Sequence, residues 1–224
     1  VPLDNGTFVG IGWDSTSDQP RLYSGALDDN DVLQMELRDS GFQTLATFNN
    51  PCGLKVAPDT ALFLAYDGSK MVSFVVQAAS PTELTYTPRF LELFSQGAAD
   101  TTPRCAVNSK GQIALGINGY IVLGQVVSGA FVATDYHHEL NTNAYGVVWL
   151  TDTRLAAVSS NYNRVLILDA ADGQLSKTSY FNWSMSSTNT PYLIRVSDYQ
   201  FLAVQVDGSN NIYCSFIDVS NGVV

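Results

Sequence analysis

The sequence has little positive charge and no long apolar run. Its 224 residues include 11 Lys and Arg against 21 Asp and Glu, which gives a formal net charge of −10. Nucleic acid binding depends on Lys and Arg that neutralise phosphates, so this composition argues against a nucleic acid partner. No apolar stretch approaches the roughly 20 residues of a membrane-spanning helix. The sequence has no basic segment followed by an apolar one, which is the pattern of a signal peptide. We therefore expect no membrane insertion.

Cysteine and histidine are also scarce. The three cysteines, Cys52, Cys105 and Cys214, are widely spaced and form no C-x-x-C motif, so they predict no metal or redox site. Their odd number leaves at least one unpaired within the chain. A Cys52–Cys105 bridge and three half-buried free thiols both stay open. The only histidines, His137 and His138, are adjacent, so in a strand they point to opposite faces and are poorly placed to bind one metal ion.

What the sequence does contain is a repeat. Five segments share one order of apolar stretches and polar turns, with approximate bounds 8–50, 51–102, 103–143, 144–190 and 191–224. The turns are rich in Asn, Asp and Gly, which adopt the positive φ of tight hairpin turns at low cost. Corresponding turns lie between 40 and 49 residues apart. They are Ser40-Gly41, Ser80-Pro81, Ser128-Gly129, Asp172-Gly173 and Asn221-Gly222.

A repeat of this length with four short strands is typical of a β-propeller. No segment has a sustained helical period. We therefore predict an all-β chain that forms a single propeller domain over 1–224, with five blades of four antiparallel strands. Residues 1–7 are candidates to close the ring. Small residues in the middle strands, such as Gly116 and Ala156, suit close packing of neighbouring sheets. A β-sandwich or a β-barrel is the alternative.

In repeat length and turn placement the chain resembles the WD-repeat, NHL and YVTN families of β-propellers. The resemblance extends from about Phe8 to Val224. It includes no motif of one subfamily, because the W-D pair Trp13-Asp14 occurs once and lies in the wrong strand. The resemblance implies a ring of blades with loops around an axial channel.

Catalytic motifs are missing. The chain has no G-x-S-x-G elbow, no H-E-x-x-H motif and no G-x-x-x-x-G-K phosphate loop. A propeller glycosidase needs carboxylates that converge on the axis, and among the strands expected to be innermost only the first, with Asp14, provides an acid. We predict that the chain is not an enzyme, with a glycoside hydrolase as the weaker alternative.

Candidate binding residues lie in the connections between repeats and on the innermost strands. Trp183 and Met185 belong to a long connection of small polar residues, a composition suited to adaptable contacts. For Trp183 the alternative is packing against an outer strand. Tyr162 lies in the second turn of its repeat. Arg104 and Arg195 lie at or within innermost strands, where they would line an axial channel.

The densest acidic cluster contains Asp28, Asn30 and Asp31. Its oxygen atoms are the ligands that Ca²⁺ takes, but the sixth position, where an EF-hand loop has Gly, is Leu33. The alternative is a hairpin turn built from residues that tolerate positive φ. We predict no required cofactor, and Ca²⁺ at this cluster is the one candidate.

The prediction for function is a non-catalytic binding or assembly module. Low charge and abundant Ser, Thr, Asn and Gln favour an extracellular or virion-exposed domain of a larger polypeptide or assembly, which binds a protein or a surface glycan. A lectin-like propeller is the alternative and predicts an aromatic residue at an equivalent position in most repeats. Four tyrosines adjoin the second turn, but at unequal offsets: Tyr66, Tyr120, Tyr162 and Tyr213.

Overall fold

The computed structural model describes residues 1–14, 19–39, 49–66, 71–91, 104–117, 119–138, 145–159, 164–183, 191–207 and 209–220. These residues form 18 β-strands and no helix, which confirms the all-β prediction. Over the same ranges, nothing has the length and hydropathy of a membrane-crossing helix. The chain divides into two compact units, residues 1–97 with 126–132 and residues 98–125 with 133–224.

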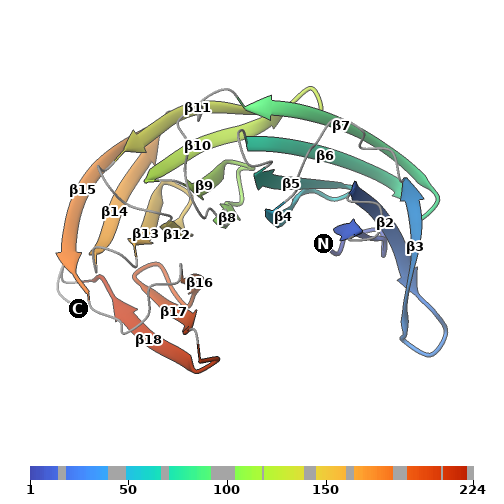
Figure 1. Cartoon of the computed structure of the whole chain (residues 1–224). Helices are drawn as coiled ribbons and strands as arrows, with labels where there is room; N and C mark the ends of the chain where they lie inside the picture. The colour runs from blue at the N-terminus through green and yellow to red at the C-terminus, as the bar shows by residue number, and fades with distance from the viewer. Residues whose placement is uncertain are drawn as a thin grey trace. The chain divides into compact units, whose positions relative to one another are not determined.

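The first unit contains two antiparallel sheets whose strands follow one another in chain order (Figure 1). The first sheet comprises β1 (Phe8–Asp14), β2 (Gln19–Leu27) and β3 (Leu33–Asp39). The second comprises β4 (Asn49–Ala57), β5 (Thr60–Tyr66), β6 (Met71–Ser80) and β7 (Glu83–Leu91). This meander is the arrangement that the repeated tight turns predict.

The second unit contains three sheets of the same kind. They comprise β8 (Arg104–Val107), β9 (Ile113–Ile117), β10 (Tyr120–Val127) and β11 (Ala130–His138); β12 (Tyr145–Thr151), β13 (Arg154–Ser159), β14 (Arg164–Ala171) and β15 (Gln174–Asn182); and β16 (Tyr192–Arg195), β17 (Gln200–Val206) and β18 (Ile212–Asp218). The tip of the β10–β11 hairpin, residues 126–132, belongs to the first unit.

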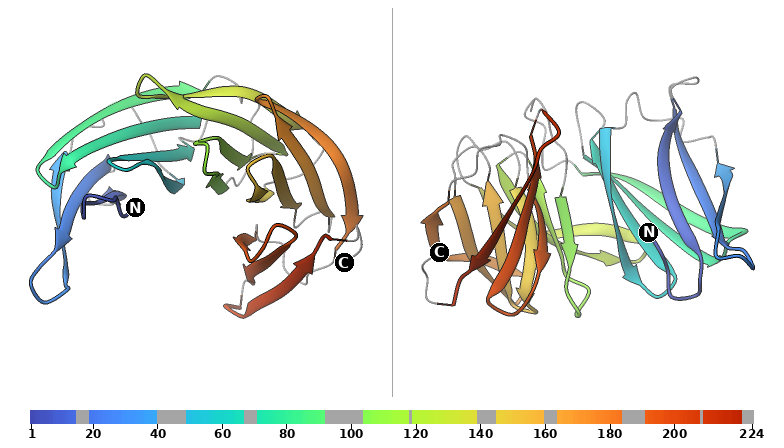
Figure 2. Two further views of the ribbon diagram at one scale, coloured as in Figure 1. Left: turned by 180° about the vertical axis from the view of Figure 1, so that it is seen from behind. Right: turned by 90° about the horizontal axis from the view of Figure 1, so that it is seen from below.

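Five sheets match the predicted number of blades, and three of them have the predicted four strands. In the first sheet a short N-terminal segment adds to β1; the N-terminus is marked in Figure 2. Pro2 forms an antiparallel bridge with Phe8, and Val1 and Val9 exchange two backbone hydrogen bonds. Residues 42–48, where the fourth strand of the first predicted blade would follow the Ser40-Gly41 turn, and the terminal residues 221–224 lie outside the described residues. A ring-closing role for residues 1–7 therefore stays a prediction.

The middle sheet of the second unit is buried on both faces. On one face Val147 and Trp149 pack against Ile121 and Leu123 of the sheet before it. On the other face Val148, Leu150 and Ala156 pack against the sheet after it, in one cluster with Phe201, Ala203 and Ile217. Burial on both faces explains why β12 has a continuous apolar sequence rather than an alternating one.

Two glycines bring the backbones of these sheets close together, as the small residues predict. A Cβ atom at Gly116 would lie 2.1 Å from the Tyr145 carbonyl oxygen. A Cβ atom at Gly146 would lie 2.4 Å from the Pro191 carbonyl oxygen. No ordinary side chain fits at such a distance, so only glycine allows these sheets to approach as they do.

One turn structure recurs in three places, at residues 28–32, 108–112 and 207–211. In each, the side-chain oxygen of the first residue accepts hydrogen bonds from the backbone N–H groups of the third and fifth. The fourth residue has positive φ: 58° at Asp31, 78° at Gly111 and 63° at Asn210. The acidic cluster is thus a hairpin turn, which confirms that alternative. Ser128-Gly129 and Asp172-Gly173 form the predicted two-residue turns with positive φ.

Candidate functional site

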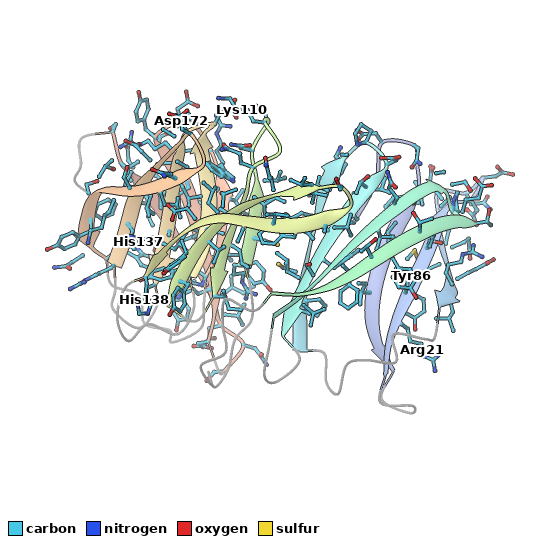
Figure 3. All side chains as sticks on the ribbon, turned by 90° about the horizontal axis from the view of Figure 1, so that it is seen from above. Arg21, Tyr86, Lys110, His137, His138 and Asp172 are labelled. Carbon is cyan, nitrogen blue, oxygen red and sulfur yellow. The ribbon has the colours of Figure 1, made fainter. Side chains whose placement is uncertain are left out.

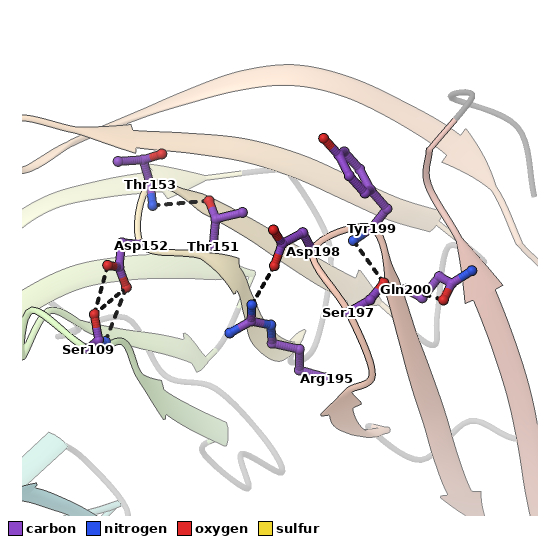
Figure 4. A network of polar contacts seen from close by, with 9 residues as sticks. All are labelled: Ser109, Thr151, Asp152, Thr153, Arg195, Ser197, Asp198, Tyr199 and Gln200. Atoms are coloured by element: carbon purple, nitrogen blue, oxygen red, sulfur yellow. Dashed lines mark hydrogen bonds and ion pairs between the residues drawn. The ribbon is translucent and has the colours of Figure 1, made fainter.

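Exposed polar side chains of the second unit meet where the first strand of each sheet turns into the second (Figure 4). Three turns contribute, one after β8, one after β12 and one after β16. The set contains Ser109, Lys110, Asp152, Arg195, Asp198 and Tyr199, and we call it the inner-turn rim. Its members come from three different repeats.

Hydrogen bonds fix the first two turns to each other. The Ser109 hydroxyl donates to the Asp152 carboxylate at 2.7 Å from each oxygen, and the Ser109 N–H donates to Oδ1 at 3.2 Å. The Asn108 side-chain amide donates to the Asp152 carbonyl oxygen at 2.9 Å. The position of the Asp152 carboxylate is therefore set by the neighbouring sheet before any ligand arrives.

The same contacts keep Asp152 negatively charged. The hydrogen bond from the Ser109 hydroxyl lowers the pKa of Asp152 below its ordinary value of 3.8, and the positive charges of Lys110 and Arg195 lower this pKa further. A carboxylate with a lowered pKa is a weak base and a good hydrogen-bond acceptor at neutral pH. Two exposed cations thus lie near one fixed, partly exposed anion.

Arg195 lies in this rim, at the end of β16. Its guanidinium contacts the Asp198 carboxylate at 2.5 Å, and both side chains remain about half exposed, at 50% and 57%. Tyr199 is also exposed, and the Arg154 guanidinium lies 5.8 Å from the centre of its ring. The structure therefore joins the predicted Arg195 to Ser109, Lys110 and Asp152, which sequence reasoning missed. Their shared signal was their place just after or at the end of an innermost strand.

Arg104 lies elsewhere. It begins β8, whereas the rim follows the ends of β8 and β16, so Arg104 and Arg195 do not form one site. The Arg104 guanidinium stacks on the ring of Tyr192, 3.9 Å from its centre, and Tyr192 is 58% exposed. Burial lowers the pKa of Arg104, and the interaction with Tyr192 acts in the opposite direction. Arg104 has its own aromatic contact at the other end of the inner strands.

Trp183 is not an exposed contact residue. Its side chain is only 7% exposed and packs with Val165, Ile167 and Phe201 in the core between two sheets. The prediction that Trp183 is an exposed contact residue is wrong, because burial of its large aromatic side chain in the core stabilises the fold more than exposure to solvent would. The other two predicted contact residues, Tyr162 and Met185, lie outside the described residues.

The predicted metal ligands occupy ordinary structural roles. Oδ1 of Asp28 accepts the N–H groups of Asn30 and Val32, and its Oδ2 accepts the Gln34 amide at 2.9 Å. These bonds lower the pKa of Asp28. Within the described ranges, no group of three or more His, Cys, Asp or Glu side chains is placed to hold a metal ion.

The two histidines lie at the edge of the second unit opposite to Lys110 and Asp172 (Figure 3). The His138 ring stacks on Tyr120 with 4.2 Å between ring centres. Asp135, two residues before His137 in β11, accepts a hydrogen bond from the Leu175 N–H at 2.7 Å. His138 and Asp135 thus each have a structural partner.

Comparisons with known proteins identify the fold. No protein-family model and no curated protein sequence matches the chain. The β-propeller domain of Cps50 (Swd1) from Myceliophteria thermophila is 12% identical, with a TM-score of 0.62, over 96% of this chain and 67% of that one. A periplasmic gluconolactonase, PpgL, from Pseudomonas aeruginosa is 12% identical, with a TM-score of 0.58, over 96% and 71%.

A third similar structure is Sqt1 from Chaetomium thermophilum, solved bound to the N-terminus of ribosomal protein L10. It is 13% identical, with a TM-score of 0.55, over 97% of this chain and 70% of that one. The class that these likenesses and the five sheets define is the β-propeller. The predicted fold class is therefore confirmed, and the sandwich and barrel alternatives are wrong.

The comparisons also correct the prediction that the chain is not an enzyme. A gluconolactonase is among the solved structures with this fold. The prediction rested on the lack of catalytic motifs and of acids on the innermost strands, and it overlooked the turns that follow those strands. Asp152, with Ser109, Lys110 and Arg195 near it, lies in such turns.

Proposed function

We propose that this chain is a binding propeller whose inner-turn rim contacts a protein partner. The observation that supports this most is the Asp152 carboxylate, which Ser109 holds at an exposed edge while Lys110 and Arg195 lie near it. Groups that are already fixed lose little conformational entropy on binding, so such a rim binds more favourably than mobile side chains of the same type. Sqt1 shows that this fold accepts a polypeptide terminus as its partner.

The rim also indicates the chemistry of the partner. It alternates cations and anions, with Lys110 and Arg195 near Asp152 and Asp198. A partner segment that contains both acidic and basic side chains would complement it. Tyr199, half exposed beside these charges, offers the aromatic contact that is often a strong contributor to interfaces. The extracellular or virion location remains a prediction from composition.

The test begins with identification of the partner by crosslinking in the source cells, followed by titration of the purified pair. Lys110→Glu combined with Arg195→Glu should weaken binding by about a hundredfold, because each reversed charge removes about 1.4 kcal/mol or more. Lys177→Glu on β15 reverses one charge away from the rim and serves as the control for each single reversal, Lys110→Glu and Arg195→Glu. Equal affinity of the double variant and the control would contradict the proposal.

Lactone hydrolysis is a second candidate, favoured by the likeness to the gluconolactonase. In the rim, Lys110 and Arg195 could stabilise the negative charge that develops when a lactone opens, and Asp152 could orient water. Purified chain should then accelerate hydrolysis of gluconolactone or its 6-phosphate, and Asp152→Asn should remove most of that activity. A rate equal to the uncatalysed one excludes this candidate.

A further inference from the structure

A second polar site lies between the first and second sheets of the second unit. It is a hollow of about 470 Å³, formed by β10 and β11 on one side and the β14–β15 turn on the other. We call it the seam hollow. Its lining includes three glutamines, Gln112, Gln125 and Gln174, together with Thr134 and Asp172. It shares no residue with the inner-turn rim.

The three carboxamides have hydrogen-bond donors and acceptors that are not used within the hollow. The Oε1 atom of Gln112 accepts a hydrogen bond from Asn108 Nδ2 at 2.8 Å, which orients its Nε2 amide group away from that contact. Gln125 and Gln174 are exposed, and within the described part of the chain neither side chain has a hydrogen-bond partner. Each therefore offers two donors and a carbonyl acceptor to a ligand.

The other two polar side chains that line the hollow, Thr134 and Asp172, can accept hydrogen bonds from a ligand. Thr134 donates its hydroxyl hydrogen to the Leu123 carbonyl oxygen at 3.3 Å, which leaves the hydroxyl oxygen able to accept a hydrogen bond. Asp172 adds a carboxylate. No Lys or Arg is among the lining residues, so an anionic ligand would meet one negative charge and no positive one.

The two sides of the seam hollow are fixed relative to each other. The Leu175 N–H donates to Asp135 Oδ2 at 2.7 Å, which joins β15 to β11 beside the hollow. The turn itself has positive φ at both residues, 53° at Asp172 and 77° at Gly173, and a Cβ at Gly173 would lie 3.9 Å from Thr134. A site with fixed sides and unpaired amides is ready to accept a ligand.

We propose that the seam hollow binds a neutral, hydroxyl-rich ligand, namely a saccharide. Sugar hydroxyls act as donor and acceptor at once, and so do the carboxamides of Gln125 and Gln174. The volume falls within the roughly 300–1,000 Å³ usual for small-molecule sites.

The first unit contains a natural comparison. Its own hollow, of about 540 Å³, has Gln77 three residues before the tight turn at Ser80, as Gln125 precedes Ser128. There the lining residues include two carboxylates, Asp59 and Glu83, and Gln77 is the one carboxamide among them. We therefore expect a saccharide to bind the seam hollow in preference to this hollow.

The test uses the ¹⁵N-labelled chain and three neutral probes, maltotriose, cellotriose and chitotriose. At about 20 mM probe, at least one should shift the side-chain amide signals of Gln125 and Gln174, as expected for a millimolar dissociation constant. Gln125→Ala and Gln174→Ala, both at exposed positions, should each weaken binding by about fivefold to tenfold, the loss of one or two hydrogen bonds. Gln34→Ala, an exposed glutamine outside the hollow, should leave the affinity unchanged.

Three results would overturn the proposal. One is the absence of shifts with all three probes, and another is shifts that leave the Gln125 and Gln174 amides unaffected. The third is equal affinity of wild type and both glutamine variants. Because the rim residues are untouched in these variants, partner binding by the rim should persist in them, so the two proposals fail separately.

Discussion

Replacement of Gly116 by alanine tests whether the close approach of two sheets determines stability in the second unit. The new Cβ would lie 2.1 Å from the Tyr145 carbonyl oxygen, about 0.9 Å inside the shortest distance that real Cβ atoms show. The obstacle is backbone in the middle of a buried sheet, so it cannot turn aside as a flexible side chain would. The two sheets must separate instead.

The expected loss of stability follows from this overlap. Overpacking of a core by one carbon costs about 1–3 kcal/mol when side chains give way, and here backbone must move, so we expect about 3 kcal/mol. For a chain of this size that corresponds to a fall in Tm of about 6–12 °C. Gly146→Ala should cost less, about 2 kcal/mol, because its Cβ would lie 2.4 Å from the Pro191 oxygen.

Urea and thermal unfolding of the variants, followed by circular dichroism, measure these losses. Gly111→Asn is the matched control, since nothing lies within 4 Å of a Cβ there and Asp31 and Asn210 adopt positive φ at the same place in their turns. We expect it to change stability by less than about 0.5 kcal/mol. The reasoning is refuted if Gly116→Ala unfolds no earlier than this control.

Three further outcomes follow from the turns and their carboxylates. Asp207→Ala should lower the urea midpoint, since it removes an acceptor of two backbone N–H groups; Asp207→Asn keeps that oxygen and should lower the midpoint less in the same titration. Hydrogen bonds lower the pKa of four aspartate side chains below the ordinary value of 3.8. Their contribution to the free energy of unfolding should therefore be constant above pH 4 and should decline as the pH falls through the pKa values of the folded state. A constant Tm from pH 5 to about pH 2 would contradict this. These four are Asp28, Asp152, Asp207 and Asp218. Millimolar Ca²⁺ should leave Tm unchanged, because the chain already satisfies both Asp28 oxygens; a rise of several degrees would establish the predicted calcium site.

The all-β fold was predictable because its signals are local. Ser128-Gly129 and Asp172-Gly173 have a strong preference for positive φ, and each adopts it between two strands. Apolar strands between such turns leave antiparallel sheets as the only way to pair the backbone. The prediction failed where the signal is not local. The residues that follow Trp183 in the sequence are mostly small and polar, as in a surface loop. Its side chain is buried because it packs against residues of the next sheet in the chain.

Only part of the candidate site could be predicted from the sequence, because the contacts between its residues are not local. Arg195 was visible as a charge on an inner strand, but Ser109 and Asp152 are ordinary turn residues in separate repeats, 43 positions apart. Their contact depends on how closely the two sheets pack, which Gly116 controls through the Tyr145 backbone. A sequence shows the turn and the glycine, but not which carbonyl oxygen the glycine will face.

This dependence makes the rim a product of the repeat rather than of any one motif. Each sheet of the second unit contributes the turn that follows its first strand. Ser109, Asp152 and Asp198 therefore meet although none of them is unusual in its own segment. A single substitution at the contact between two sheets of the second unit should therefore change the geometry of the inner-turn rim. If Gly116→Ala separates the first two sheets, the Ser109–Asp152 hydrogen bonds should lengthen, and the pKa of Asp152 should rise toward its ordinary value. Measurement of that pKa by carboxyl NMR in both proteins links the packing to the site, and an unchanged pKa would show that the rim forms independently of the seam.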